Sequence, residues 1–502
     1  MGEIKQVSRE TDASLPHSLW RAEQIRQAEI ALAAAAGISL YALMERAGGA
    51  LEQHILQRWP GARRVLICCG AGNNGGDGYV LARRLREKGL MVTVLATREP
   101  ARLKGDAGRA ASSWLAAGGS VLGVDAPVPA PDLVIDAVLG TGVALPVEGD
   151  PARLIARINH WQQEGTPVLA VDLPSGLQAD TGLVLGEVVQ ASETLTFIGL
   201  KPGLLTGAGP NWCGRLSLAP LGLAIDHWGA PVAQRIDYPA LASHLAPRRR
   251  TAHKGDHGRV LLVGGNAGMQ GAILLAARAA LRAGAGLVRV CQHPSLPAPS
   301  LSQPELMQAD PSELGLGWDS VRVIGPGLGQ DEWARRCFAA ALCQNESLVI
   351  DADGLNLLAQ HPLHRDNWVL TPHPGEAARL LGCRVAEVEA DRLAAVTALQ
   401  QRYGGVVVLK GAGTLIHDGE QLRLCNEGNP GMASGGMGDL LSGIIAALLA
   451  QGLPAAQAAA LGVALHGEAG DLAATEGERG MLASDLLPWV RRLVNPQISQ
   501  ER

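Results

Sequence analysis

Short runs of aliphatic residues alternate with longer amphipathic stretches along most of the chain. In the first half the runs cover residues 65–69, 91–95, 133–138 and 168–171, and the stretches between them cover residues 79–88, 105–117 and 151–163. The runs are apolar throughout, as expected of strands that are buried on both faces of a sheet. This alternation predicts a parallel sheet with helices on both sides.

The alternation stops between residues 220 and 250, in a mixed segment that contains prolines and ends in Arg248–Arg250. It then resumes, with apolar runs at 260–263, 287–291, 321–324, 348–350, 368–370 and 406–409 and helical stretches at 270–283, 438–450 and 455–475. We therefore expect two α/β domains, residues 1–225 and 236–502. A chain of 502 residues is also too long for one ordinary core, since a domain usually has about 150 residues.

The composition is that of a folded protein that acts on small molecules. Hydrophobic residues make up 47% of the chain and charged residues 18%, which excludes a disordered chain. The net charge of −5 creates no positive field for nucleic acid or anionic lipid, so we expect neither as a partner. A homo-oligomer is compatible with the sequence, which does not determine the oligomeric state.

The expected location is the cytoplasm. The chain has eight cysteines and no Cys-x-x-Cys spacing, which fits neither a disulfide framework nor a zinc site. The first twenty residues contain no apolar segment of the kind that a signal peptide needs. The longest apolar tracts, residues 31–44 and 440–450, are shorter than the roughly 18 residues that cross a bilayer, so we expect buried helices there.

A glycine-rich segment, GAGNNGGDG at 70–78, follows the first predicted strand. Its start fits the G-x-G-x-x-G pattern of dinucleotide dehydrogenases, which is one hypothesis for this half. Two features weaken it. Asp77 would repel a pyrophosphate at the start of the next helix, and the acidic residue expected about 20 positions later is missing, since VTVLATRE reaches only Glu99.

Polar residues at three successive strand ends suggest a cation site instead. Asn74 follows the first strand, Asp136 ends the strand in LVIDAVLGTG, and Ser175 follows the next one in VDLPSG. Parallel strands deliver these loops to one edge of the sheet, and oxygen ligands suit a hard cation. Each loop taken alone is also explained as a turn, because Asn and Asp beside glycine are common turn formers.

The strongest local signal in the second half is GNPGMASGGMGDLLSGIIAALLAQG, residues 428–452. Five glycines precede Asp439, and an apolar helix follows. A helix N-terminus that opens from such a loop presents free N–H groups to an anion, and phosphate is the obvious one. Asp439 is either a helix cap or a catalytic base. No G-x-x-x-x-G-K-[ST] occurs, so a P-loop is excluded.

In the first half, NNGGDG, DAVLGTG and VDLPSG resemble the epimerase domain of the bifunctional NAD(P)H-hydrate repair enzymes, over residues 18–221. The resemblance implies a Rossmann-like fold that interconverts the R and S forms of the hydrated nucleotide, NAD(P)HX. It implies K⁺ held by Asn74, Asp136 and Ser175. The implied substrate contacts are Asn73, Asn74, Gly75, Gly76, Asp77, Gly140, Thr141, Gly142, Val143, Ala144, Leu145, Pro146 and Asp172.

Breaking and reforming the C–O bond of the hydrate passes through a ring cation, which the Asp172 carboxylate can stabilise or assist by moving a proton. Lys201, in GLKPG, is a second candidate for this site, and a surface turn explains it almost as well.

The second half resembles the dehydratase domain of the same family, over residues 238–494. Its glycine loop is similar to the GxGD anion hole of ribokinase-like kinases, and HKGDHGRVLLVGG, GPGLG, TPHPGE and LKGAGT are the further matching segments. The resemblance implies a ribokinase-like fold that uses ADP and Mg²⁺ to dehydrate (S)-NAD(P)HX to NAD(P)H, giving AMP and phosphate. The implied hydrate contacts are Ala272, Gly327, His373 and Asp439, and the nucleotide contacts are Lys410, Gly411, Ala412, Gly413, Thr414 and Gly438.

In this interpretation Asp439 is the catalytic base and Lys254 and Lys410 are candidate charge partners, while His373 is a ligand contact or only satisfies local hydrogen bonds. Two other hypotheses stay open. One is a ribokinase-type small-molecule kinase fused to a nucleotide-binding module, and the other is a first domain that only senses nucleotides or binds a protein. The kinase hypothesis leaves Asn74, Asp136 and Ser175 without a role.

Overall fold

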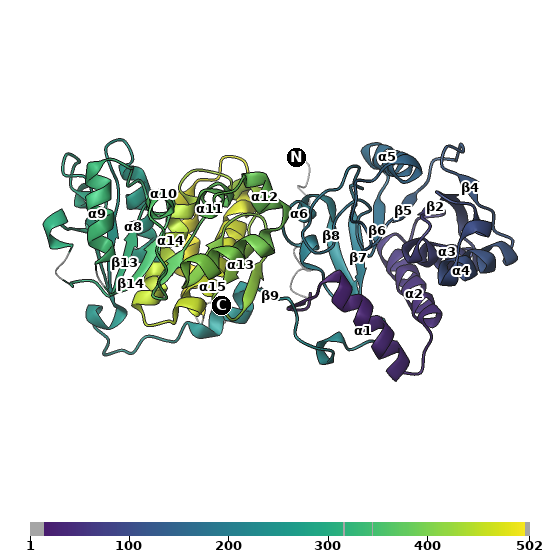
Figure 1. The fold of residues 1–502 in the computed structure, drawn as a ribbon, viewed down its shortest axis with the longest axis horizontal. Coiled ribbons are helices and arrows are strands. Elements are labelled where there is room, and N and C mark those ends of the chain that lie inside the picture. Colours follow the sequence, from purple (N-terminus) through teal and green to yellow (C-terminus); the bar gives the residue numbers. More distant parts are fainter. Residues whose placement is uncertain (1–14, 315–316, 344, 497–502) are drawn as a thin grey trace. The chain divides into compact units, whose positions relative to one another are not determined.

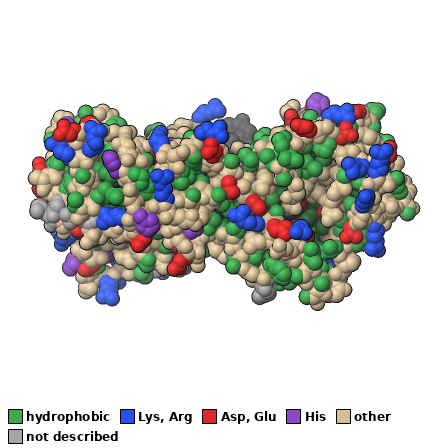
Figure 2. Space-filling model, in the orientation of Figure 1, with side chains coloured by type: hydrophobic (Ala, Val, Ile, Leu, Met, Phe, Trp, Pro, Cys, Tyr) green, Lys and Arg blue, Asp and Glu red, His purple; other side chains and the backbone are tan. Residues whose placement is uncertain are grey.

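The computed structural model describes residues 15–314, 317–343 and 345–496, and the chain forms two compact units, Met1–Ala233 and Gln234–Arg502 (Figure 1). Each contains parallel strands covered by helices, so the predicted α/β class is confirmed. On the face that Figure 2 shows, acidic and basic side chains are interspersed.

The first unit contains a sheet in the order β4-β3-β2-β5-β6-β7-β8 with every pair parallel. Its strands are β1 (Ser18–Leu19, outside this sheet), β2 (Arg64–Cys69), β3 (Met91–Ala96), β4 (Leu122–Gly123), β5 (Leu133–Ala137), β6 (Val168–Val171), β7 (Glu193–Phe197) and β8 (Arg215–Ala219). Its helices are α1 (Ala22–Ala35), α2 (Leu40–Arg58), α3 (Asn73–Glu87), α4 (Gly105–Ala116), α5 (Gly149–Gln163) and α6 (Gly209–Trp212). Helices α1 to α4 share a core with one face of the sheet, and α5 packs on the other face.

Most of the glycine-rich segment after β2 is helical, because α3 begins at Asn73 and only residues 70–72 precede it. Several of its glycines allow close packing. A Cβ on Gly75 would overlap the carbonyl oxygen of Gly70, and one on Gly78 would lie 2.8 Å from the Cys69 sulfur. The segment therefore brings the helix start directly onto the sheet, as glycines in this position do in nucleotide-binding folds.

The apolar tract at residues 31–44 is not one buried helix. Helix α1 ends at Ala35, a turn follows at Gly37 with φ +67°, and α2 starts at Leu40. Within the described residues no one helix has the length and apolar character to cross a membrane; α1 and α2, bent by 109°, meet the criteria of length and composition only as a pair.

The sheet of the second unit has the order β9-β18-β17-β16-β15-β14-β13-β10-β11-β12. Its strands are β9 (Ala233–Ile236), β10 (Arg259–Val263), β11 (Leu287–Cys291), β12 (Met307–Gln308), β13 (Val321–Ile324), β14 (Ser347–Ile350), β15 (Trp368–Leu370), β16 (Val406–Leu409), β17 (Thr414–His417) and β18 (Leu422–Cys425). Its helices are α7 (Tyr238–Leu241), α8 (Gln270–Arg282), α9 (Glu332–Leu342), α10 (Ala352–Gln360), α11 (Pro374–Leu381), α12 (Val385–Ala390), α13 (Arg392–Tyr403), α14 (Met437–Ala450), α15 (Ala455–Ala473) and α16 (Leu487–Leu493).

Strands β16, β17 and β18 pair antiparallel, which the sequence pattern did not predict. The remaining pairs of this sheet, from β16 to β12 and between β18 and β9, are parallel.

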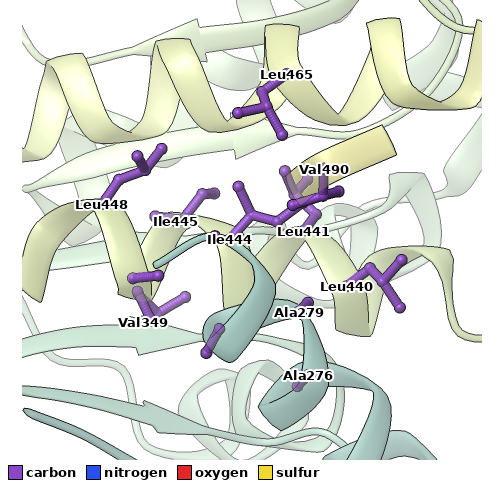
Figure 3. Close-up of a cluster of buried hydrophobic side chains, with 14 of the residues drawn as sticks. Ala276, Ala279, Val349, Leu440, Leu441, Ile444, Ile445, Leu448, Leu465 and Val490 are labelled. Atoms are coloured by element: carbon purple, nitrogen blue, oxygen red, sulfur yellow. The ribbon is translucent and has the colours of Figure 1, made fainter. Parts of the chain in front are cut away.

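Helices α8 and α14 pack against each other in the core of the second unit (Figure 3). A Cβ on Gly443 of α14 would overlap the carbonyl oxygen of Ala276, so the two helix backbones come unusually close. Leu440, Leu441, Ile444 and Ile445 of α14 are buried, as predicted for the tract at 440–450. This packing holds the N-terminus of α14, and with it Asp439, against a rigid support.

Two candidate active sites

The three predicted cation ligands of the first unit lie together around the backbone of Leu139. The Ser175 hydroxyl donates to Asp136 Oδ1 at 2.6 Å, and the Ser175 N–H donates to Asp136 Oδ2 at 2.8 Å. The Asn74 side-chain amide donates to the Leu139 carbonyl at 2.9 Å, while the Leu139 N–H donates to the Ser175 hydroxyl at 2.8 Å. Three loops from separate strand ends therefore meet, as parallel pairing requires.

Asp136 is fully buried, and burial raises the pKa of its carboxyl to about 6, although hydrogen bonds from Ser175 lower it in part. Its hydrogen bonds come from Ser175 and from the Val138 N–H, and within the described residues no cationic side chain pairs with it. A buried carboxylate without a positive partner is electrostatically costly, so a cation would fit beside it.

A pocket of about 600 Å³ opens next to these residues, which is within the usual range for small-molecule sites. It is lined by Gly72, Asn73, Asn74, Val138, Leu139, Gly140, Thr141, Gly142, Val143, Ala144, Leu145, Pro146, Val147, Glu148 and Pro151. The predicted substrate loop 140–146 and both asparagines thus face one cavity. Gly75 and Gly76 do not line it, because they are buried in the packing of α3.

Asp172 directly follows β6 and forms an ion pair with Lys201. Its Oδ1 also accepts hydrogen bonds from the Thr196 hydroxyl and the Phe197 N–H, both at 3.0 Å. Lys201 is only 1% exposed, so the surface-turn interpretation of this lysine is wrong. Asp172 has φ +65°, a strained conformation of the kind found at functional sites.

In the second unit, Asp439 lies in the first turn of α14 without capping it. The N-cap is Gly436, with φ +94°, and no side chain in the described part of the chain caps the free N–H groups. Asp439 is half-buried, and within the described residues its carboxylate has no hydrogen-bond or ion-pair partner. Burial raises the pKa of Asp439 to about 7, Asp351 acts in the same direction, and Lys410 opposes them. The cap interpretation is therefore wrong, and the carboxylate is available to a ligand.

A buried charge network lies beside Asp439. Lys410 Nζ is 2.7 Å from Asp351 Oδ1 and 4.0 Å from Glu376 Oε2, and the Ser442 hydroxyl donates to Asp351 Oδ2 at 2.7 Å. Burial works against the charged form of Asp351, but Lys410 and the hydrogen bonds leave its pKa below the usual range. Burial raises the pKa of Glu376 to about 7.

Sequence reasoning missed Asp351, Glu376 and Ser442. The signal for Asp351 was present, since it directly follows the apolar run at 348–350, just as Asp172 follows the run at 168–171.

The predicted nucleotide loop runs from Lys410, at the end of β16, to Thr414, at the start of β17. The Thr414 hydroxyl donates to the Gly411 carbonyl at 3.0 Å, which closes the turn. A Cβ on Gly438 would lie 3.0 Å from Lys410 Nζ, so the loop and the N-terminus of α14 are neighbours. The two parts of the predicted anion site thus meet.

Of the other predicted hydrate contacts, Ala272 lies in the first turn of α8, Gly327 follows β13 and His373 follows β15. A Cβ on Gly327 would lie 3.2 Å from the Ala272 side chain, so these two residues are adjacent. His373 caps α11, where its Nδ1 accepts the Gly375 N–H at 2.9 Å. Burial lowers the pKa of His373, and Lys410 adds to the effect, so at neutral pH the imidazole is largely neutral.

Lys254 is not part of this site. It precedes β10, at the amino end of that strand, where Gly258 approaches the carbonyl of Ala450 at the last residue of α14. Asp439 lies at the opposite end of the same helix. The prediction of Lys254 as a charge partner of Asp439 is therefore wrong.

Comparisons with known proteins cover both units. A family model described as "NAD(P)H-hydrate dehydratase" matches residues 260–492, and one described as "YjeF-related protein N-terminus" matches residues 40–203. The chain is 48% identical over 500 residues to the bifunctional NAD(P)H-hydrate repair enzyme Nnr of Escherichia coli K12, a match that covers 97% of this chain and 96% of that protein. It is 47% identical over 493 residues to the enzyme of the same name from Coxiella burnetii, with 95% and 99% covered.

Among solved structures, the chain is similar to the ADP/ATP-dependent NAD(P)H-hydrate dehydratase from Bacillus subtilis, which was co-crystallised with ATP/Mg²⁺. The sequence identity is 28%, the match covers 52% of this chain and 96% of that chain, and the TM-score is 0.48.

Proposed function

The chain belongs to the family of bifunctional NAD(P)H-hydrate repair enzymes, and from this membership we propose how its two sites divide the reaction. The first unit interconverts (R)- and (S)-NAD(P)HX. The second unit dehydrates the S form to NAD(P)H and converts ADP to AMP and phosphate. Because only one isomer is dehydrated, the epimerase makes the other isomer usable.

In the epimerase, Asp172 stabilises the cation that forms when the hydroxyl leaves the ring. Its carboxylate is fixed by three hydrogen bonds, including one from Lys201, so it is preorganised to face developing positive charge. The pocket beside Asn73 and Asn74 binds the rest of the nucleotide, with the loop 140–146 as its wall.

Asn74, Asp136 and Ser175 are the residues that would hold K⁺. Their donor set, one buried carboxylate, one amide oxygen and one hydroxyl, suits a hard cation of low charge, and Asp136 pairs with no cationic side chain in the described part of the chain. A K⁺ ion bound by these residues would supply the positive charge that Asp136 lacks.

In the dehydratase, Asp439 removes the proton from the ring hydroxyl, whose oxygen attacks the terminal phosphoryl group of ADP. The new O–P bond forms as the bond to AMP breaks. Phosphate then leaves the ring carbon with its bonding electron pair, and the loss of a proton from the neighbouring carbon gives NAD(P)H. Hydroxide is a poor leaving group and phosphate a good one, which is why the nucleotide is consumed.

The phosphates of ADP lie between the loop 410–414 and the N-terminus of α14. Free N–H groups at this helix end and the Lys410 ammonium stabilise the charge on the transferring group. Asp351, Glu376 and Asp439 are the carboxylates near which Mg²⁺ would bind, mainly through phosphate oxygens and water, and it would neutralise phosphate charge there.

All eight cysteines carry free thiols, which supports a reducing compartment, and we assign the protein to the cytoplasm.

The observation that carries this proposal is the half-buried, unpaired Asp439 carboxylate beside Lys410 at an open helix N-terminus.

The test is to incubate the purified chain with both isomers of NADHX and ADP, and to follow the absorbance of reduced nicotinamide and the release of phosphate. Asp172→Ala is expected to stop consumption of the R isomer and spare the S isomer. Asp439→Ala is expected to abolish dehydration while epimerisation continues. Equal loss of both activities in either variant would contradict the division.

A further inference from the structure

Helix α1 is fastened over the carboxyl end of β7, close to the epimerase site. The Trp20 N–H donates to the Leu200 carbonyl at 2.8 Å, and the Ala22 N–H donates to Asp180 Oδ1 at 2.8 Å. A Cβ on Gly199 would lie 3.2 Å from the Ile25 side chain. The first turns of α1 therefore lie against the segment that leads to Lys201, the partner of Asp172.

Glu29 stands on the packed face of this helix. Ile25 and Ala33, one turn before and after it, are buried, and Glu29 is half-buried. Glu23 lies on the exposed face and pairs with Arg26 at 2.7 Å. Glu29, in contrast, has no hydrogen-bond or ion-pair partner among the described residues. A half-buried carboxyl group without a partner is costly for the fold and calls for a reason.

Three of the charged groups that act electrostatically on Glu29 or are affected by it belong to the epimerase site: Asp172 after β6, Lys201 after β7 and Asp77 on α3. A fourth, Arg26, lies on the same helix as Glu29. Burial raises the pKa of Glu29 to about 7 and Asp172 adds to the rise, whereas Lys201 and Arg26 oppose it. Burial also raises the pKa of Asp77 well above its usual range, with smaller contributions from Asp172 and Glu29. A carboxyl group whose pKa lies near 7 is suited to donate a proton at neutral pH.

Asp172 and Glu29 differ in what they can do. Asp172 Oδ1 already accepts hydrogen bonds from Thr196, Phe197 and Lys201, so Asp172 is suited to stabilise charge. The Glu29 carboxyl is free to give and take a proton. Two carboxyl groups in unlike environments, one paired and one desolvated, are how enzymes separate charge stabilisation from general acid catalysis.

We propose that Glu29 is a catalytic acid of the epimerase. Glu29 protonates the ring hydroxyl as that group leaves, and the Glu29 carboxyl group becomes a carboxylate in the same step. This inference rests on the proposed function of the first unit. The C–O bond breaks with its electron pair on oxygen, the Glu29 proton converts the leaving hydroxide into water, and the ring carbon and nitrogen share the positive charge. Water then adds to the opposite face, its excess proton passes to solvent, and Glu29 regains a proton from solvent.

The test uses the full chain with separated R and S isomers, ADP, Mg²⁺ and K⁺. NADH formation from the S isomer reports the dehydratase alone, and formation from the R isomer requires epimerisation first. Glu29→Gln keeps the size of the side chain and removes the acid. The rate from the R isomer is expected to fall about 100-fold, the lower range for loss of general acid catalysis, with an unchanged rate from the S isomer. Glu23→Gln, on the exposed face of the same helix, is the matched control and should change neither rate.

A pH profile and a conservative variant distinguish a catalytic role of Glu29 from a purely structural one. Epimerisation by the unsubstituted chain should decline as the pH rises above about 7, and this decline should be absent from the residual rate of Glu29→Gln. Glu29→Asp keeps an acid and should retain part of the rate together with the decline.

The proposal fails if Glu29→Gln epimerises within about threefold of the unsubstituted chain. It also fails if Glu29→Asp is as inactive as Glu29→Gln while the S isomer is still dehydrated. If the unsubstituted chain cannot use the R isomer at all, the proposed function of the first unit is wrong, and this inference fails with it.

Discussion

The Lys410 ammonium lies 2.7 Å from an oxygen of Asp351, a carboxylate whose side chain is only 2% exposed. Lys410 is the first residue of the predicted nucleotide loop, and Asp351 directly follows strand β14. The ion pair therefore fixes the loop to the end of β14, beside the first turn of α14. This arrangement makes Lys410 important for stability as well as for the phosphate binding proposed above.

Lys410→Met should destabilise the second unit by about 3 kcal/mol, because removing one partner leaves the buried Asp351 charge uncompensated. The free energy of unfolding in urea measures this effect. Adding Asp351→Asn to Lys410→Met removes the stranded charge and should restore most of the loss. The control is Arg336→Met, which breaks an exposed ion pair with Glu332 and should cost less than about 1 kcal/mol. A double variant that is less stable than Lys410→Met would contradict the argument.

Dehydration should depend on the ionisation of Asp439. Burial raises its pKa to about 7, and the base must be deprotonated to act. The kcat/KM for (S)-NADHX is therefore expected to rise as the pH increases through about 7 and to level off above it. Epimerisation is expected to follow the opposite direction, since Glu29 acts in its protonated form. A dehydratase rate that falls across the same interval would exclude Asp439 as the base.

The Asp136 site should confer dependence on monovalent cations. Asp136→Asn removes the only charge among the three proposed ligands but keeps the size of the side chain. We expect the unsubstituted chain to epimerise faster with K⁺ than with Li⁺ as the only monovalent cation, and Asp136→Asn to lose that difference. Dehydration of the S isomer by the same samples is the internal control. A variant that responds to K⁺ like the unsubstituted chain would contradict the site.

The pattern of apolar runs predicted most of the parallel strands to within one residue, because strands buried on both faces are uninterrupted in hydrophobicity. It did not predict the antiparallel strands β17 and β18. These strands include partly buried polar residues such as Thr414 and Arg423, so they lack that signature. The pattern also did not separate the end of α1 from the start of α2, because apolar residues continue across the turn at Gly37.

The site residues at strand ends could be predicted, because the topology of a parallel sheet brings strand ends together whatever the separation in sequence. Asp136 and Ser175 are examples. Glu29 could not be predicted in this way. It lies inside a helix, and which face of that helix packs on the sheet depends on tertiary contacts such as Ile25 against Gly199.

The close contact of α8 and α14 gives a stability test that does not depend on the chemistry. A Cβ on Gly443 would overlap the Ala276 carbonyl oxygen, which belongs to a helix backbone that cannot move away without disturbing the core shown in Figure 3. Gly443→Ala should therefore lower the free energy of unfolding by about 1–3 kcal/mol, the usual cost of overpacking. It should also weaken dehydration, because Asp439 lies one turn away on α14.

The matched control is Gly271→Ala, in the exposed first turn of α8. A Cβ there meets no atom within 4 Å, so alanine should stabilise the helix by up to about 1 kcal/mol. Opposite signs for the same substitution in two packed helices would show that the cost at Gly443 comes from the contact and not from helix propensity. If Gly443→Ala is as stable as Gly271→Ala, the two helices are not held together as closely as the structure indicates, and the rigid support inferred for Asp439 is wrong.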